Sequence, residues 1–201
     1  MTDQLLERMA VRELVENWAL WRDAGFWDRF RSVWHDDGRI MATWLQASAD
    51  EFIAGSKKVF ESDVSILHAL EGTTVDVVGN RAIAMTKMTI SQRAPVHDIL
   101  CDVVCSGRFY DFIEKRDGEW GFVLRHPIFE KDRIDPVDPS AQLVLDQDLL
   151  NQFPVGYRHL AYLQTGLGYD VKRDMPGLRG PEVEKLYAEG QAWLDGQPLK
   201  R

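Results

Sequence analysis

The sequence predicts an α+β fold, with helices before a run of antiparallel strands and more helices after it. Two observations lead to this prediction. Apolar residues recur at helical spacing over the first 61 positions, and positions 65–130 are rich in Val, Ile, Thr, Phe and Tyr. Helices followed by a block of strands are typical of the α+β class. The 201 residues, 45% of them hydrophobic, fit one domain with an extension.

The first third of the chain is predicted to be mainly helical. A serine followed three residues later by a glutamate, Ser48 and Glu51, is a capping-box pattern that indicates the start of a helix. The apolar residues that give the first helix its spacing are Leu5, Met9, Leu14, Trp18 and Trp21. The elements expected here are helices over 2–24, 26–35 and 48–61 and a short strand over 39–44.

The middle of the chain is predicted to form four strands. Turn signals separate them, and the strongest is Asp117–Gly118, since this pair suits the positive φ angles of a tight hairpin. Cys101 and Cys105 fall on one face of a strand, roughly 13 Å apart, which is too far for a disulfide. The expected strands span residues 65–78, 81–94, 98–115 and 119–130.

The last third of the chain changes character again. Asp135 begins a Pro-rich stretch that is typical of a linker, so we expect one unit over 1–134 and a helical C-terminal extension over 135–201. Aromatic and leucine side chains in the extension predict that it packs against another part of the protein. It would either cover the mouth of a pocket or pack around a neighbouring subunit, and the sequence does not choose between these two possibilities. Its expected helices lie near 142–152, 155–165 and 181–195.

Two polar residues interrupt apolar segments and are candidates for chemistry. Asp23 follows an apolar turn at the end of the first helix, and His68 shares a strand face with Ile66 and Leu70. A buried carboxylate beside a buried imidazole makes a general base, because the carboxylate fixes the tautomer and stabilises the protonated ring. The alternatives are a solvated helix-end aspartate and a core histidine.

Further candidates surround this pair. Arg125 closes an apolar strand and would bind an oxyanion or a leaving group, with His126 as a weaker candidate, although an ordinary ion pair explains the arginine equally well. Among the seven tryptophans, most are expected in the core. A few, such as Trp18, Trp21 and Trp44, would hold a flat hydrophobic substrate.

Composition and missing motifs exclude several classes of function. A net charge of −8 argues against general affinity for nucleic acids or anionic membranes. Scattered histidines predict no metal site, and no nucleotide-binding glycine motif or nucleophilic serine elbow is present, so no cofactor is expected. The start of the sequence lacks a signal-peptide pattern and no apolar run reaches 18 residues, so we expect a cytoplasmic protein.

The order of several short segments resembles a known superfamily. Trp21-Arg-Asp-Ala-Gly25 is followed by Val33-Trp-His-Asp-Asp-Gly38, Leu67-His-Ala69, and Lys115-Arg-Asp-Gly-Glu-Trp-Gly-Phe122 with Arg125. This order is similar to the SnoaL-like branch of the nuclear transport factor 2-like superfamily, over roughly residues 5–133. It looks most like the group of hexachlorocyclohexane dehydrochlorinase, scytalone dehydratase and bile-acid 7α-dehydratase.

The resemblance implies a fold and an activity. It implies a cone of curved antiparallel sheet, closed by N-terminal helices around a deep pocket, in a homo-oligomer, with a trimer favoured over a dimer. It also implies an Asp–His dyad at Asp23 and His68, with Arg125 near a departing group. The dehydrochlorinase lysine is replaced here by Trp18, and its tryptophan by Ile40, so one particular elimination is not favoured.

Three functions remain open from the sequence. The first is a cofactor-free lyase that removes water, halide or formaldehyde from a hydrophobic aromatic or alicyclic substrate. The second is a ketosteroid-type isomerase or a polyketide cyclase. The third is a non-enzymatic ligand-binding module, which would be favoured if Asp23 and His68 lay beyond hydrogen-bonding distance.

Overall fold

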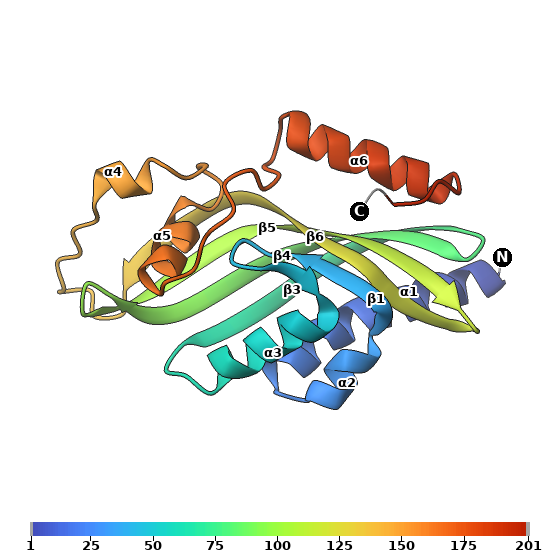
Figure 1. Ribbon diagram of the computed structural model, residues 1–201, viewed down its shortest axis with the longest axis horizontal. Coiled ribbons are helices and arrows are strands. Elements are labelled where there is room, and N and C mark those ends of the chain that lie inside the picture. Colours follow the sequence, from blue (N-terminus) through green and yellow to red (C-terminus); the bar gives the residue numbers. More distant parts are fainter. Residues whose placement is uncertain (1, 200–201) are drawn as a thin grey trace.

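The computed structural model describes residues 2–199 and contains a six-stranded sheet that curls around the helices on its inner side (Figure 1). The strand order is β2-β1-β6-β5-β4-β3. The strands are β1 Trp34–Met41, β2 Gln46–Ser48, β3 Ser65–Val78, β4 Arg81–Val96, β5 Ile99–Arg116 and β6 Glu119–Pro136. The helices are α1 Thr2–Asp23, α2 Trp27–Ser32, α3 Ala49–Phe60, α4 Gln147–Leu150, α5 Arg158–Gly166 and α6 Pro181–Leu194.

The sheet is mixed, whereas the sequence predicted an antiparallel one. β1 runs parallel to β6, with Ile40 opposite Arg125, while every other neighbouring pair is antiparallel. Parallel pairing requires a long crossover, and here 85 positions separate Ile40 from Arg125, so no local turn signal indicates the pairing. The α+β class and the curled sheet are confirmed.

Local signals in the sequence explain where the elements begin and end. Ser48 caps α3 and forms the predicted capping box with Glu51. Asp117 and Gly118 have the positive φ angles, 51° and 91°, of the predicted hairpin turn. The strand β6 continues to Pro136, beyond the point where the extension was expected to begin.

The buried face of α1 differs from the one that the spacing suggested. Leu5 and Met9 are 58% and 54% exposed. The helix instead buries a stripe that ends in a charged residue: Val11, Val15, Trp18, Ala19 and Arg22. The buried stripe of α1 therefore runs from Val11 to Arg22, while Glu7 in its first turns binds Lys115 and Trp120 of the β5–β6 hairpin.

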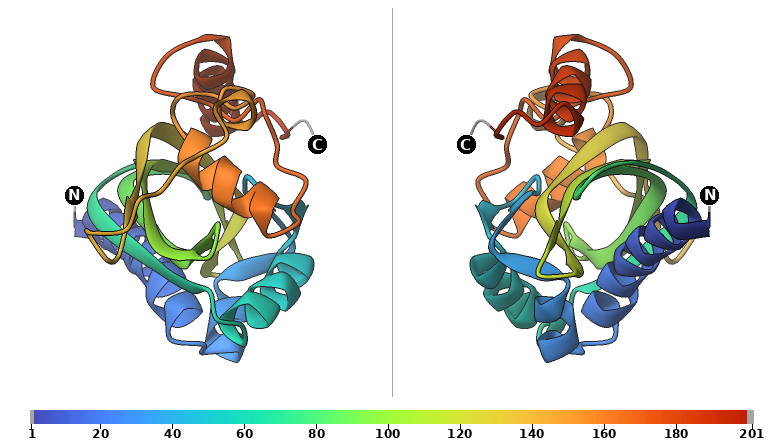
Figure 2. Two further views of the ribbon diagram at one scale, coloured as in Figure 1. Left: turned by 90° about the vertical axis from the view of Figure 1, so that its left-hand side faces the viewer. Right: turned by 90° about the vertical axis from the view of Figure 1, so that its right-hand side faces the viewer.

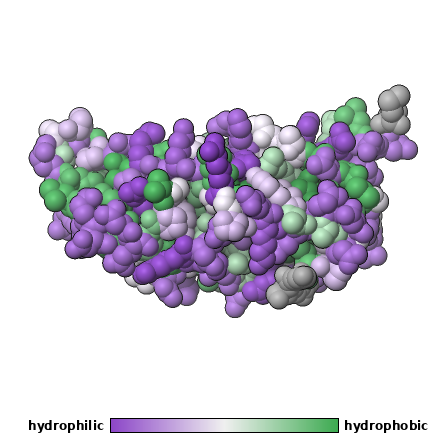
Figure 3. All heavy atoms as spheres, turned by 90° about the horizontal axis from the view of Figure 1, so that it is seen from above, coloured by the Kyte–Doolittle hydropathy of each residue, from purple (hydrophilic) through white to green (hydrophobic). Residues whose placement is uncertain are grey.

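Helices cover the sheet on both faces (Figure 2). On the concave face the core is made by α1–α3 and α5, and both cysteines lie there as buried free thiols. α6 packs on the convex face, where Val183, Leu186 and Trp193 contact a separate apolar cluster. The face seen from above is mainly hydrophilic, with hydrophobic residues in scattered patches (Figure 3). Among residues 2–199, no helix is long and apolar enough to span a membrane.

Candidate active site

The carboxylate of Asp23 holds His68 by two hydrogen bonds. Asp23 ends α1 and His68 lies in β3, so the contact joins the last turn of the helix to a strand near the edge of the sheet. The ring Nδ1 of His68 lies 2.9 Å from Oδ1 of Asp23, and the backbone N–H of His68 donates to Oδ2 at 2.6 Å. Because one carboxylate binds both the ring and the backbone of the same residue, the orientation of the imidazole is fixed.

Burial and neighbouring charges set the protonation of this pair. The side chains of His68 and Asp23 are 8% and 14% exposed. Burial lowers the pKa of His68 below its ordinary value, and the nearby cations Arg22 and Arg125 lower it further. Together these effects outweigh the hydrogen bond to Asp23, which raises the pKa. Burial opposes the charge on Asp23, but the hydrogen bonds from His68 and the charge of Arg22 hold its pKa below the ordinary value. A neutral imidazole therefore faces an ionised carboxylate near neutral pH.

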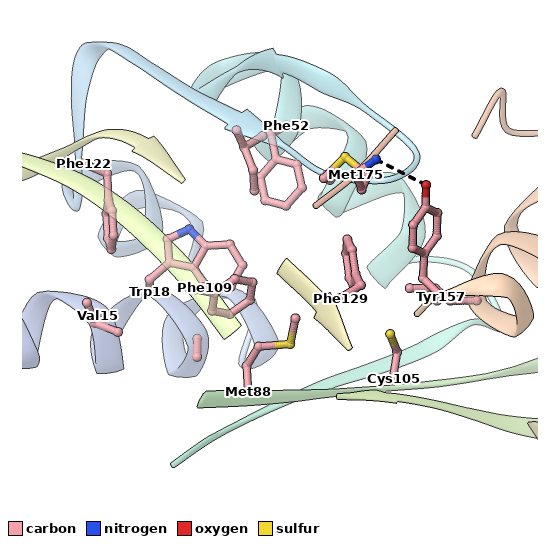
Figure 4. Close-up of a cluster of buried hydrophobic side chains, with 14 of the residues drawn as sticks. Val15, Trp18, Phe52, Met88, Cys105, Phe109, Phe122, Phe129, Tyr157 and Met175 are labelled. Atoms are coloured by element: carbon pink, nitrogen blue, oxygen red, sulfur yellow. Dashed lines mark hydrogen bonds between the residues drawn. The ribbon is translucent and has the colours of Figure 1, made fainter. Parts of the chain in front are cut away.

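A small cavity of about 50 Å³ lies beside His68. Its wall is largely aromatic and aliphatic: Trp18 is 1% exposed and its ring meets that of His68 edge to face, with centroids 5.3 Å apart. Figure 4 shows Trp18, Phe52, Phe109 and Phe129 grouped in the interior. The lining residues are Trp18, Arg22, Ile40, Ala42, Thr43, Trp44, Phe52, Ile66, His68, Ile90, Gln92, Phe109, Pro127, Phe129, Leu160 and Gln164.

Arg125 lies close to this cavity but is not part of its lining. Its guanidinium makes a bidentate ion pair with Asp111, at 2.8 and 2.7 Å, and both side chains are completely buried. The guanidinium carbon lies 4.1 Å from the ring centroid of Trp18 and 4.2 Å from that of Phe109. Contact of Arg125 with a leaving group stays a prediction: its Nη1 has no hydrogen-bond partner within the described residues, although the side chain does not line the cavity. The guanidinium also packs on Trp18, which forms part of the cavity wall.

The other predicted residues separate into two groups. Trp18 and Trp44 line the cavity, and their contact with a substrate stays a prediction. Trp21 is partly buried against the core but does not line the cavity. His126 lies in a different pocket, between the sheet and α6, because neighbouring residues of a strand face opposite sides and Arg125 occupies the inner side.

Sequence reasoning missed four polar residues that line the cavity, and Thr43, between β1 and β2, is one of them. Arg22 is 4% exposed, and it follows Val11, Val15 and Trp18 at helical spacing, which is the signal that would have found it. Gln92 is 4% exposed, and strand alternation places it on one face with buried apolar residues of β4. Gln164, 5% exposed, belongs to α5 of the extension, and only the tertiary fold brings it to the cavity.

A second aspartate–histidine pair has the same local geometry in a different setting. Oδ1 of Asp132 lies 2.8 Å from Nδ1 of His159, and its Oδ2 accepts the backbone N–H groups of His159 and Leu160. His159 does not line the cavity. Its partner Asp132 links the start of α5 to β6 through these hydrogen bonds. The position beside a cavity is thus what distinguishes His68. No group of three His, Cys, Asp or Glu side chains within the described chain is arranged to hold a metal ion.

A curled sheet closed by helices around an apolar cavity defines a protein of the nuclear transport factor 2-like class. The model of the SnoaL-like domain matches residues 3–126, and the chain belongs to this family. The matched segment contains both Asp23 and His68, and it ends before the extension.

Relatives and solved structures agree with this assignment. Pea pathogenicity protein 2 of Fusarium vanettenii is 36% identical, and the alignment covers 97% of this chain and 88% of that protein. A putative scytalone dehydratase of Novosphingobium aromaticivorans superposes with a TM-score of 0.56 at 17% identity, over 72% of this chain and all of that one. The hexachlorocyclohexane dehydrochlorinase LinA-type3 of Novosphingobium barchaimii gives 0.54 at 15%, over 72% of this chain and 99% of that one. These two structures show the shared fold.

Proposed function

We propose that the protein is a cofactor-independent lyase that eliminates water, halide or formaldehyde from a small hydrophobic substrate, aromatic or alicyclic. His68 is the general base and Asp23 orients it. One observation carries the proposal: the imidazole is held at Nδ1 by a carboxylate 2.9 Å away and lines an apolar cavity. The names of two structural neighbours, a scytalone dehydratase and a dehydrochlorinase, support an elimination by analogy.

The geometry suggests how the proton moves. With its Nδ1–H donated to Asp23, His68 keeps the lone pair on Nε2 free to accept a proton from a substrate carbon. For loss of water or halide, the electrons of the broken C–H bond form the new double bond, and the leaving group departs from the adjacent carbon with its own electron pair. For loss of formaldehyde, the base takes the O–H proton of a hydroxymethyl group, the O–H electrons form the C=O bond, and the electrons of the broken C–C bond stay on the remaining carbon, which then takes up a proton. The charge of Asp23 stabilises the imidazolium that results, and this attraction is strong because little water is present.

Isomerisation or cyclisation would use the same base, but nothing leaves the substrate. In that case the proton returns to a different carbon and the product keeps the mass of the substrate. A ligand-binding module is less well supported, because it needs no Asp23–His68 contact and that contact is made at 2.9 Å.

A mass-spectrometric screen tests the proposal. The protein is incubated with hydrophobic hydroxylated aromatics and steroids, and we expect a product lighter by one water, hydrogen halide or formaldehyde. In His68→Gln the rate falls by about 10²- to 10⁴-fold, because the general base is lost. His159→Gln is the matched control, since it also removes an aspartate-bound imidazole but one outside the cavity, and it keeps the rate.

Two results would contradict the lyase. An isomeric product of unchanged mass would assign the same dyad to an isomerase. Turnover that survives His68→Gln at the rate of His159→Gln would exclude His68 as the base.

A further inference from the structure

Two carboxamides face a cavity whose walls are otherwise mostly apolar. Gln92 comes from β4, and Gln164 comes from α5 of the extension. Both are at least 95% buried, and each lines the cavity that His68 also lines. A buried carboxamide is normally hydrogen-bonded, because leaving its donors and acceptors unpaired is costly.

Gln92 lacks such partners. Within residues 2–199 the side chain of Gln92 makes no hydrogen bond, and its amide atoms are not among the fully buried polar atoms that lack a partner, so they border open space. Its strand neighbours on the same face are apolar, among them Ile90 and Ala94. Because Gln92 lines the cavity and is only 4% exposed, we take the cavity as the open space that its amide borders.

Gln164 is fixed at one end and free at the other. Its Oε1 accepts a hydrogen bond from the hydroxyl of Thr43 at 2.6 Å, and this contact is buried. The bond occupies the carbonyl oxygen and leaves the N–H₂ group as a donor toward the cavity. Thr43 also lines the cavity, in the connection between β1 and β2, so the extension and the N-terminal half of the chain together hold this amide.

We propose that Gln92 and Gln164 are the specificity-determining residues of the site, and that they bind a neutral oxygen of the substrate, a carbonyl or a hydroxyl. A carboxamide donates and accepts, which matches such an oxygen, whereas carbon-bound chlorine is a poor partner. The inference deepens the proposed function, on which it rests: the substrate would be an oxygenated ring compound and not a halogenated hydrocarbon.

Cyclohexanone and chlorocyclohexane are suitable probes because they have the same ring and differ in the oxygen. Isothermal titration calorimetry measures both dissociation constants, and we expect the wild-type protein to prefer cyclohexanone by about tenfold or more. Gln92→Leu and Gln164→Leu each reduce this preference, since the amide is replaced by an apolar group of similar size. Gln152→Leu, at an exposed position, is the matched control and keeps the preference.

Gln92→Met provides a second, flexible replacement, and thermal melting confirms that each variant is folded. A wild-type protein without a preference, whether it binds both probes or neither, overturns the inference. Folded Gln92 variants that keep the full preference overturn it as well.

Deuterium exchange separates this inference from the proposed function. In D₂O, a base in the cavity exchanges the α-hydrogens of bound cyclohexanone, and His68→Gln abolishes the exchange. If the preference is present but the wild-type protein catalyses no exchange, the base assignment fails and the recognition by Gln92 and Gln164 stands.

Discussion

Burial acts on both members of the Asp23–His68 pair, and it disfavours the charged form of each. For Asp23 alone, the hydrogen bonds that it receives and the charge of the adjacent Arg22 outweigh burial and lower the pKa of the carboxylate. For His68 burial prevails, so its pKa lies below the ordinary value of 6.5. The pair therefore rests as a neutral base beside an ionised partner, which is the state that proton abstraction requires.

The lowered pKa of His68 predicts how activity and stability depend on pH. The rate of deuterium exchange should fall only when the pH drops through a value below 6.5, where His68 becomes protonated. The unfolded state binds this proton first as the pH falls, so the free energy of unfolding also decreases with acid below 6.5. Measured pH–rate and pH–stability profiles check both. A rate midpoint above 6.5 would contradict a base whose pKa is lowered by burial.

Single residues also show where the sequence was informative. Asp23 and His68 were found because each interrupts an apolar segment and both fit the order of motifs in the family. Arg125 was correctly expected at an apolar strand, but only the fold shows that Asp111 binds its Nε and Nη2 and that Nη1 is left unpaired within the described residues. His126 was a weaker inference, since strand alternation alone argues that adjacent residues do not share a face.

At the scale of elements, α5 depends on a carboxylate from another element. The helix has no side-chain cap of its own at Tyr157. Asp132 of β6 supplies the missing acceptor, and its side chain is fully buried. Because buried N–H groups need partners, this contact links the folding of the extension to the sheet.

Asp132→Asn tests that link. The new amide keeps the size but offers one acceptor in place of two, so the free energy of unfolding should decrease by about 1–2 kcal/mol. Chemical denaturation measures this loss, and hydrogen exchange should become faster in α5. Asp148→Asn, at an exposed position in α4, is the control. Equal stability of the two variants would show that Asp132 does not anchor the helix.

Elements formed by neighbouring residues were predictable, and those that depend on distant ones were not. Strand β3 begins and ends at the predicted residues, 65 and 78, because its residue types and the following turn are local signals. The pairing of β1 with β6 escaped prediction because nothing near β1 encodes its distant partner. The exposed Leu5 shows that apolar spacing alone does not identify the buried side of a helix.

At the scale of the whole molecule, the size of the cavity constrains the substrate. Sites for small molecules usually measure about 300–1,000 Å³, and this cavity measures about 50 Å³. A ring compound therefore has to displace part of the wall. Arg22 and Ile66 line both the cavity and a surface depression beside Asp23, so this part of the wall separates the interior from solvent.

The assembly state is a further prediction at this scale. The family resemblance implies a homo-oligomer, and we expect a trimer with three times the chain mass of 23.1 kDa. Light scattering coupled to size-exclusion chromatography measures the mass in solution. A monomer would contradict the prediction, and a dimer would contradict the preference for a trimer.

The hydrogen bond between Thr43 and Gln164 joins two distant parts of the sequence at one cavity. The residues that would move the proton lie within the segment shared by the family, 3–126, whereas Leu160 and Gln164 reach the same chamber from outside it. Of the two proposed specificity residues, Gln92 lies within that shared segment and Gln164 lies beyond it. Substitutions at Leu160 or Gln164 would therefore alter the cavity wall without changing Asp23 or His68.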